Sequence, residues 1–193
     1  MGVTNILALR GDFPKGWEET KGDFHYANEL IEFIKLNFPE FSISIAGNPE
    51  KHIEARSLQE DIAHLRTKQD SGGDFIMTQL CYDLEQYERW VDKIRKAGIS
   101  IPIDVGIMPV LSKDSTIRMT VSNGCSIPRE LSEIIGKYGD NPEDFKKAGK
   151  DYTTRLIYNY INLGIDGLHI YSLNKWENIA EILNDAGLSG IKI

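Results

Sequence analysis

Residues 74–107 read DFIMTQLCYDLEQYERWVDKIRKAGISIPIDVGI and contain two short apolar runs, 74–80 and 101–107. Runs of this length that are bounded by Gly and Pro are typical of strands rather than of buried helices. Between the runs, apolar side chains recur at the spacing of one helix face: Tyr87, Trp90, Val91 and Ile94. Gly98 follows this pattern, where a helix commonly ends on a residue with positive φ. The segment therefore predicts a strand–helix–strand unit with parallel strands.

The same unit recurs along the rest of the chain. Three more strands are predicted, at 5–10 (NILALR), 41–46 (FSISIA) and 167–173 (GLHIYSL). Other helical stripes lie between the strands: Leu30, Ile31, Ile34 and Leu36; Leu58, Ile62 and Leu65; Ala148, Tyr152, Leu156 and Tyr160; and Ile179, Ile182 and Leu183. Three of these stripes are followed by glycine: Gly72-Gly73, Gly164 and Gly187. An extra helix is expected at 128–138. We expect one α/β domain over residues 1–193.

Two architectures contain such units, the doubly wound sheet and the barrel. A doubly wound sheet usually has a Gly-rich phosphate loop after its first strand, and neither G-x-G-x-x-G nor G-x-x-x-x-G-K-[ST] occurs here. A (β/α)8 TIM barrel has its chemistry at the C-terminal ends of its strands, where this chain carries its polar motifs. We therefore favour a TIM-barrel type. Because a full barrel has eight strands in about 250 residues and about five are predicted here, either three strands escape the pattern or the chain is part of a barrel.

Composition excludes several classes of function. The net charge of −7 argues against binding a nucleic-acid backbone. No run approaches the ~20 apolar residues of a membrane span, and no secretory signal is present, so we expect a cytoplasmic protein. Cys81 and Cys125 are too few for a disulfide framework or a zinc site, and both are expected to be reduced and buried. The acidic residues have no metal-site spacing, so we expect no metal.

Polar side chains near the predicted strand ends are candidates for ligand binding. Asp12 is either a solvated turn residue or a carboxylate at the barrel mouth. His52 is either a structural residue or a ligand contact. One helix face carries three polar residues that are either solvated or bind ribose and pyrophosphate: Asp61, His64 and Lys68. Gln79 alternates with apolar neighbours in a strand, so its amide needs partners and is a candidate ligand contact.

Motifs at five strand ends share a further property when they are taken together. In chain order they are 5–12 (NILALRGD), 46–52 (AGNPEKH), 74–80 (DFIMTQL), 106–110 (GIMPV) and 169–174 (HIYSLN). This series resembles the strand-end motifs of methylenetetrahydrofolate reductases, which are flavin-dependent (β/α)8 barrels. In that family the L-R-G-D motif closes the fourth strand, so the resemblance implies strands four to eight. The first three βα units, which include the family's general-acid glutamate, have no counterpart in this sequence.

The resemblance also implies a flavin and folate site. The positions that match FAD contacts in the family are Arg10, Gly11, Asp12, Tyr26, Ala27, His52, Ala55, Asp61 and Lys68. Asp12 and Gln79 match the residues that meet folate, and Gln79 also matches a nicotinamide contact. Asp12 is the implied catalytic residue, because an anionic side chain stabilises the cationic iminium form of the folate. Five positions depart from the family pattern. Asn48 and Met119 each replace an aromatic residue, and Lys175 replaces an arginine. His64 and Thr67 stand where asparagine and arginine are common.

The implied reaction is the reduction of 5,10-methylenetetrahydrofolate to 5-methyltetrahydrofolate, with FAD as cofactor and NADH or NADPH as donor, in one-carbon and methionine metabolism. The alternative is a non-catalytic flavin-binding or assembly fragment that needs a separate N-terminal half. An open sheet of five strands has two unpaired edges, which favour association. We therefore expect either self-association or a requirement for the missing half.

Overall fold

The computed structural model describes residues 2–11, 16 and 22–188. The strands in this part of the chain are β1 (Asn5–Ala8), β2 (Ser42–Gly47), β3 (Phe75–Leu80), β4 (Ile103–Ile107) and β5 (Gly167–Ile170). The helices are α1 (Ala27–Asn37), α2 (Leu58–Asp70), α3 (Leu84–Lys96), α4 (Lys113–Ser122), α5 (Arg129–Tyr138), α6 (Pro142–Leu163) and α7 (Trp176–Asp185). All five predicted strands are therefore present, each within two or three residues of its predicted bounds.

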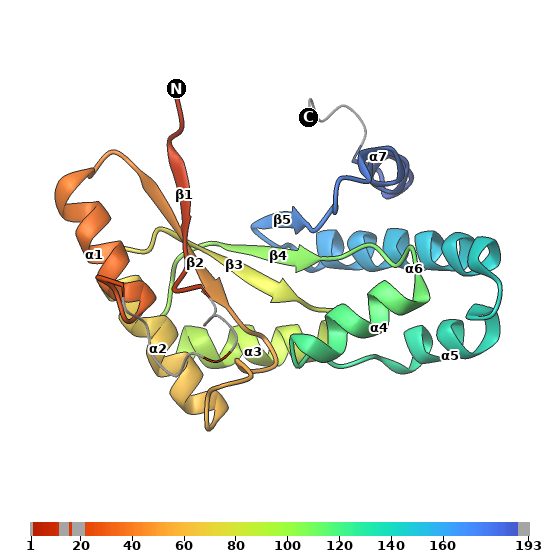
Figure 1. Ribbon diagram of the computed structural model, residues 1–193, viewed down its shortest axis with the longest axis horizontal. Coiled ribbons are helices and arrows are strands. Elements are labelled where there is room, and N and C mark those ends of the chain that lie inside the picture. Colours follow the sequence, from red (N-terminus) through yellow and green to blue (C-terminus); the bar gives the residue numbers. More distant parts are fainter. Residues whose placement is uncertain (1, 12–15, 17–21, 189–193) are drawn as a thin grey trace.

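The strands form one parallel sheet whose spatial order is the order of the chain, β1-β2-β3-β4-β5. A doubly wound sheet reverses its strand order at a switch point, whereas a barrel adds each new strand on the same side. In Figure 1 the sheet is open, with β1 at one edge and β5 at the other. The fold is thus an incomplete barrel of the TIM type, as the sequence predicts.

One face of the sheet carries the core. Ile76 of β3 faces α3, since a Cβ at Gly47 would lie 3.2 Å from the Trp90 ring and in contact with Ile76. Along β3 the buried residues on this face alternate with half-buried residues on the other. On β1 the second face is open, and the side chains of Leu7 and Leu9 are 40% and 50% exposed. The face that lines a closed barrel is therefore partly uncovered at the β1 edge.

The helices end near the glycines that the sequence pattern indicates. Gly72, Gly98, Gly164 and Gly187 all have positive φ, between 79° and 113°. Each lies directly after a helix or one residue beyond it, where a side chain would strain the backbone. The glycines therefore confirm where the chain turns back toward the sheet.

Some predicted details are wrong. Leu36 is 83% exposed, because α1 turns only Ile31 and Ile34 into the core. α4 was not foreseen as a separate helix, since its buried positions are Thr116 and Thr120 rather than apolar residues. Cys125 is only half-buried, while Cys81 is buried as expected, and both are free thiols. No helix in the described ranges is long and apolar enough to cross a membrane.

Candidate functional site

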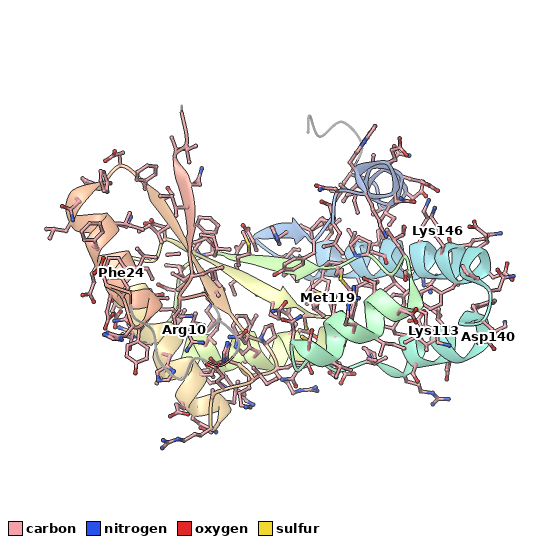
Figure 2. The ribbon with its side chains drawn as sticks, in the orientation of Figure 1. Arg10, Phe24, Lys113, Met119, Asp140 and Lys146 are labelled. Carbon is pink, nitrogen blue, oxygen red and sulfur yellow. The ribbon has the colours of Figure 1, made fainter. Side chains whose placement is uncertain are left out.

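The loops after β1 and β2 are joined by an ion pair. Arg10 follows β1, and its guanidinium lies 2.9 Å from the carboxylate of Glu54 in the loop after β2. Gly11 has φ of 78°, and apart from its chain neighbours no atom of the described residues lies within 4 Å of the position that a Cβ would occupy. Figure 2 shows Arg10 beyond the end of β1. The predicted residues Arg10 and Gly11 are thus at the strand-end edge, while Asp12 lies outside the described residues.

The loop after β2 brings three predicted residues together. The backbone N–H of His52 donates to Asp61 Oδ2 at 3.0 Å, and His52 Nδ1 accepts from the backbone N–H of Glu54 at 3.2 Å. Lys51 has φ of 81°, and its ammonium donates to the carbonyls of His52 and Ala55 at 3.0 and 2.5 Å. The loop that contains His52 and Ala55 is therefore tied to the first turn of α2, where the Asp61 carboxylate accepts from its backbone.

Lys68 lies against the neighbouring strand. Its ammonium donates to the carbonyl of Ala46 in β2 at 2.5 Å. Burial lowers the pKa of Lys68, and the negative charge of Asp61 partly opposes that effect. His64 is exposed, whereas Asp61 is buried and Lys68 is half-buried. Of the predicted polar face of α2, Asp61 and Lys68 are therefore engaged with backbone groups, while the side chain of His64 is exposed to solvent.

Tyr26 and Ala27 lie where α1 begins. The backbone N–H groups of His25 and Tyr26 donate to the Glu29 carboxylate at 2.6 and 3.2 Å. These two bonds lower the pKa of Glu29. The Tyr26 ring is 63% exposed. The start of α1 is thus an ordered helix N-terminus whose aromatic residue faces solvent.

Gln79 ends β3 with both atoms of its amide engaged. Its Oε1 accepts from the backbone N–H of Leu80 at 2.8 Å, and its Nε2 donates to Asn123 Oδ1 at 2.9 Å. Asn123 caps the C-terminal end of α4, the helix that carries Met119 in Figure 2. The half-buried amide of Gln79 therefore has the partners that the sequence predicts. Asn123 itself was missed, because nothing in a sequence joins positions 44 residues apart.

The ends of β3 and β5 are linked across β4. Tyr171 donates its hydroxyl to the carbonyl of Thr78 at 3.0 Å. Thr78 Oγ1 accepts from the backbone N–H of Gly106 at 2.8 Å, at the register shift between β3 and β4. The ring of Tyr171 also packs edge-on against the ring of His169, with centroids 4.6 Å apart. This aromatic pair closes one side of the site.

Asp104 and His169 are titratable groups on neighbouring strands. The carboxylate of Asp104 lies directly over Gly167, where a Cβ would overlap it. Burial raises the pKa of Asp104, and the charge of His169 opposes this. Burial lowers the pKa of His169, and the charge of Asp104 opposes that. Desolvation therefore favours the neutral form of each.

A shallow pocket lies beyond β4 and β5. Its lining residues are Met108, Pro109, Leu111, Ser112, Ser115, Tyr171, Ser172, Leu173 and Lys175. Leu173 and Asn174 both have positive φ, 47° and 60°, and the N–H of Lys175 donates to the carbonyl of Ser172 at 2.9 Å. This tight turn sets the ammonium-bearing Lys175 among the lining residues. The pocket is thus lined by a mixture of apolar side chains, three serines and one lysine.

The fold has a counterpart among solved structures. An uncharacterized protein from Clostridium thermocellum, described as binding two copies of 5-methyl-5,6,7,8-tetrahydrofolic acid, matches with a TM-score of 0.60 and 17% identity. The match covers 83% of this chain and 59% of that one. At this identity the likeness concerns the fold alone.

Curated sequences give closer relatives. Methylenetetrahydrofolate reductase 1 of Schizosaccharomyces pombe is 38% identical over 190 residues, which are 97% of this chain and 32% of that protein. The 5,10-methylenetetrahydrofolate reductase of Escherichia coli is 31% identical over 187 residues, 97% of this chain and 62% of that protein. The chain therefore spans about a third to three fifths of these relatives. A sequence model described as methylenetetrahydrofolate reductase matches residues 1–187. On this evidence of sequence and fold, the chain belongs to the methylenetetrahydrofolate reductase family.

Proposed function

We propose that this chain forms strands four to eight of a flavin-dependent methylenetetrahydrofolate reductase barrel. In this proposal the completed barrel reduces 5,10-methylenetetrahydrofolate to 5-methyltetrahydrofolate with NADH or NADPH. The observation that carries the proposal is the joining of strand-end loops of an incomplete barrel: Arg10 to Glu54, and Gln79 to Asn123. Family membership and the folate-binding neighbour with this fold support the substrate class.

The residues present fit FAD at two points. The open space at Gly11 leaves bare backbone beside Arg10, where a planar ring system can approach. On the other side, the ammonium of Lys68 lies at β2 and supplies a positive charge suited to a diphosphate. Three further proposed contacts are His52 and Ala55 in the loop after β2 and Asp61 in the first turn of α2, which accepts from the backbone of that loop. Tyr26 and Ala27 complete the proposed FAD contacts at the start of α1.

When bound, FAD would supply the hydride that passes to the folate. In this proposal the chain's own residues bind and orient the cofactor and the substrates. Gln79 offers an amide to the folate and, in turn, to the nicotinamide. Asp12 supplies a negative charge that stabilises the cationic iminium of the substrate. Lys175, in the pocket beyond β5, is positioned to attract an anionic part of a ligand.

The proposal includes a partner for the uncovered face of the sheet. Leu7 and Leu9 are 40% and 50% exposed on that face. In the described part of the chain β1 pairs only with β2, so its second edge is free to pair. A chain segment with three βα units would cover both the open face of the sheet and the free edge of β1. Self-association through the same edge is the alternative occupant, and the cytoplasm remains the predicted location.

A second function, a non-catalytic flavin-binding or assembly module, is favoured by the same open face. The deciding experiment measures NADH and NADPH oxidation with menadione as acceptor, and the visible spectrum of the purified chain with added FAD. We expect a bound-flavin spectrum with little turnover by the chain alone, and turnover after addition of the first three βα units from a relative. Robust oxidation by the chain alone refutes the non-catalytic module. No flavin binding in either preparation refutes the proposed reductase.

A further inference from the structure

Three hydrogen bonds run in series from β3 to α4. The backbone N–H of Leu80 donates to Gln79 Oε1 at 2.8 Å. Gln79 Nε2 then donates to Asn123 Oδ1 at 2.9 Å. Finally, Asn123 Nδ2 donates to the carbonyl of Met119 at 2.7 Å. Two side-chain amides are thus held between one backbone donor and one backbone acceptor.

The direction of this series is fixed by its ends. A backbone N–H only donates and a carbonyl only accepts. If the Gln79 amide turned over, its NH2 group would face the Leu80 N–H, and the same reversal at Asn123 would set oxygen against the carbonyl of Met119. Each reversal would leave a half-buried polar group without its bond. Gln79 and Asn123 therefore each have a single amide orientation.

The segment that follows Asn123 is held by a further contact. Three residues further on, the backbone N–H of Ser126 donates to both carboxylate oxygens of Glu50, each at 3.0 Å, and the Ser126 hydroxyl also contacts that carboxylate. Glu50 lies in the loop after β2, so the loop after α4 is tied to a different strand end. The segment that follows Asn123 is therefore anchored to the loop after β2, while Asn123 itself is held by its bonds to Gln79 and Met119.

We propose that Asn123 is a positioning residue, which orders the Gln79 amide so that one N–H and one oxygen lone pair are presented to the ligand in a known direction. This inference rests on the proposed function, in which Gln79 contacts folate and nicotinamide. A ligand group with an adjacent acceptor and donor, such as the amide-like edge of a pterin or a carboxamide, matches that presentation. Without Asn123, the Gln79 side chain would be free to change rotamer before the ligand binds. Binding would then carry the entropy cost of fixing one rotamer, so the affinity for the ligand would fall.

Hydrogen exchange of the Gln79 amide protons, measured by NMR on the 15N-labelled chain, tests the ordering. Gln79→Met identifies the signals by their loss. We expect one proton of Gln79 to exchange about tenfold more slowly than a free amide. Asn123→Ala should abolish this protection, Asn123→Asp should keep it because an acceptor remains, and Ser122→Ala is the matched control. Unprotected protons in the unmodified chain, or protection that survives in Asn123→Ala, overturn the proposal. Loss of protection in folded Asn123→Asp does so as well, which keeps the test decisive if the alanine variant folds poorly.

Calorimetric titration with 5-methyltetrahydrofolate tests whether the ordering serves binding. We expect Asn123→Ala to bind about tenfold more weakly and Ser122→Ala to bind like the unmodified chain. Unchanged affinity in Asn123→Ala, once protection is lost, overturns the positioning role. Failure of the chain to bind this folate, alone and after addition of the three missing βα units, contradicts the proposed function instead. The exchange experiment still decides whether Asn123 orders Gln79.

Discussion

Tyr171 donates its hydroxyl to the carbonyl of Thr78 at 3.0 Å, although 93 residues separate them in the chain. The tyrosine is just past β5 and the threonine is in β3, so the bond passes over β4. Gly106 makes this crossing possible, because a Cβ there would overlap Thr78 O and lie 2.9 Å from Tyr171 Cε2. The hydrogen bond between Tyr171 and Thr78 therefore depends on the absence of a side chain at Gly106 in β4.

We expect Gly106→Ala to destabilise the protein by about 1–3 kcal/mol, because the added methyl group must displace either backbone or the Tyr171 ring. Urea unfolding followed by circular dichroism measures this change. Gly136→Ala is the matched control, since Gly136 lies in α5 and, outside the neighbouring backbone of that helix, no atom of the described residues lies within 4 Å of its Cβ position. There alanine should be neutral or stabilising by about 0.5–1 kcal/mol. Equal destabilisation by the two variants would contradict the crossing as the cause.

The second prediction concerns pH. Burial raises the pKa of Asp104, so the folded state binds its proton more tightly than the unfolded state does. The folded protein therefore loses stability relative to the unfolded chain as pH rises through the pKa of Asp104. Asp104→Asn has no charge to desolvate, and its gain in stability should be small at pH 3 and larger at pH 7.

Unfolding free energies measured at several pH values test this prediction. Asp92→Asn removes a carboxylate from an exposed position on α3 and serves as the control. The opposing charge of His169 limits the size of the effect, so the pH trend, rather than its magnitude, is the observable. A gain that is equal at pH 3 and pH 7 would contradict the prediction.

The repeated units were predictable because local patterns specify them. Helical stripes such as Tyr87, Trp90 and Ile94 are buried as expected, and the glycines after the helices have positive φ. α4 escaped prediction because Thr116 and Thr120 are its buried residues, and threonine gives no apolar period. The order of the strands in the sheet could be predicted from the repeated units. The contacts that join one strand end to another could not.

The site was predictable in part. Gln79 was identified because an amide between apolar neighbours in a strand requires partners, and it has them. Its partner Asn123 and the linked pair Tyr171 and Thr78 belong to distant segments, so only the folded chain brings them together. The spacing of Asp61, His64 and Lys68 predicts a shared side of α2, but it does not predict that Asp61 is buried while His64 is exposed. Long-range contacts of this kind have no local signature.

The third prediction tests the role of Lys68 in cofactor binding. Lys68→Met should weaken FAD binding by about tenfold, because a charge-assisted contact to the diphosphate is lost. It should also lower stability by about 1–2 kcal/mol, since the Ala46 carbonyl loses its side-chain donor. Quenching of flavin fluorescence measures the affinity. His64→Ala, at an exposed position on the same helix, should bind FAD normally. Equal affinity in Lys68→Met would remove Lys68 from the flavin site.

The fourth prediction concerns the open edge at β1. At micromolar concentration the chain alone should associate, because Leu7 and Leu9 are exposed beside an edge that lacks a second partner in the described part of the chain. Leu7→Glu should reduce the mass measured by light scattering. Leu36→Glu is the control, since Leu36 is 83% exposed on helix α1 and not on a strand. A monodisperse monomer of the unmodified chain would contradict this prediction.

The last prediction concerns Asp12, and it rests on the resemblance of residues 5–12 to the family motif. In the barrel completed with the three missing units, Asp12→Asn should retain FAD and slow the folate half-reaction by about 10²–10³. The amide keeps the size of the side chain but removes the charge that stabilises the cationic iminium. Reduction of the flavin by NAD(P)H should not slow to the same extent. In the unmodified chain the negative charge of Asp12 opposes reduction of the flavin, and the variant removes that charge. Stopped-flow absorbance measures the two half-reactions separately. Equal slowing of both, or loss of FAD, would show that Asp12 acts as a turn residue that holds its loop, since a purely structural defect would not distinguish the half-reactions.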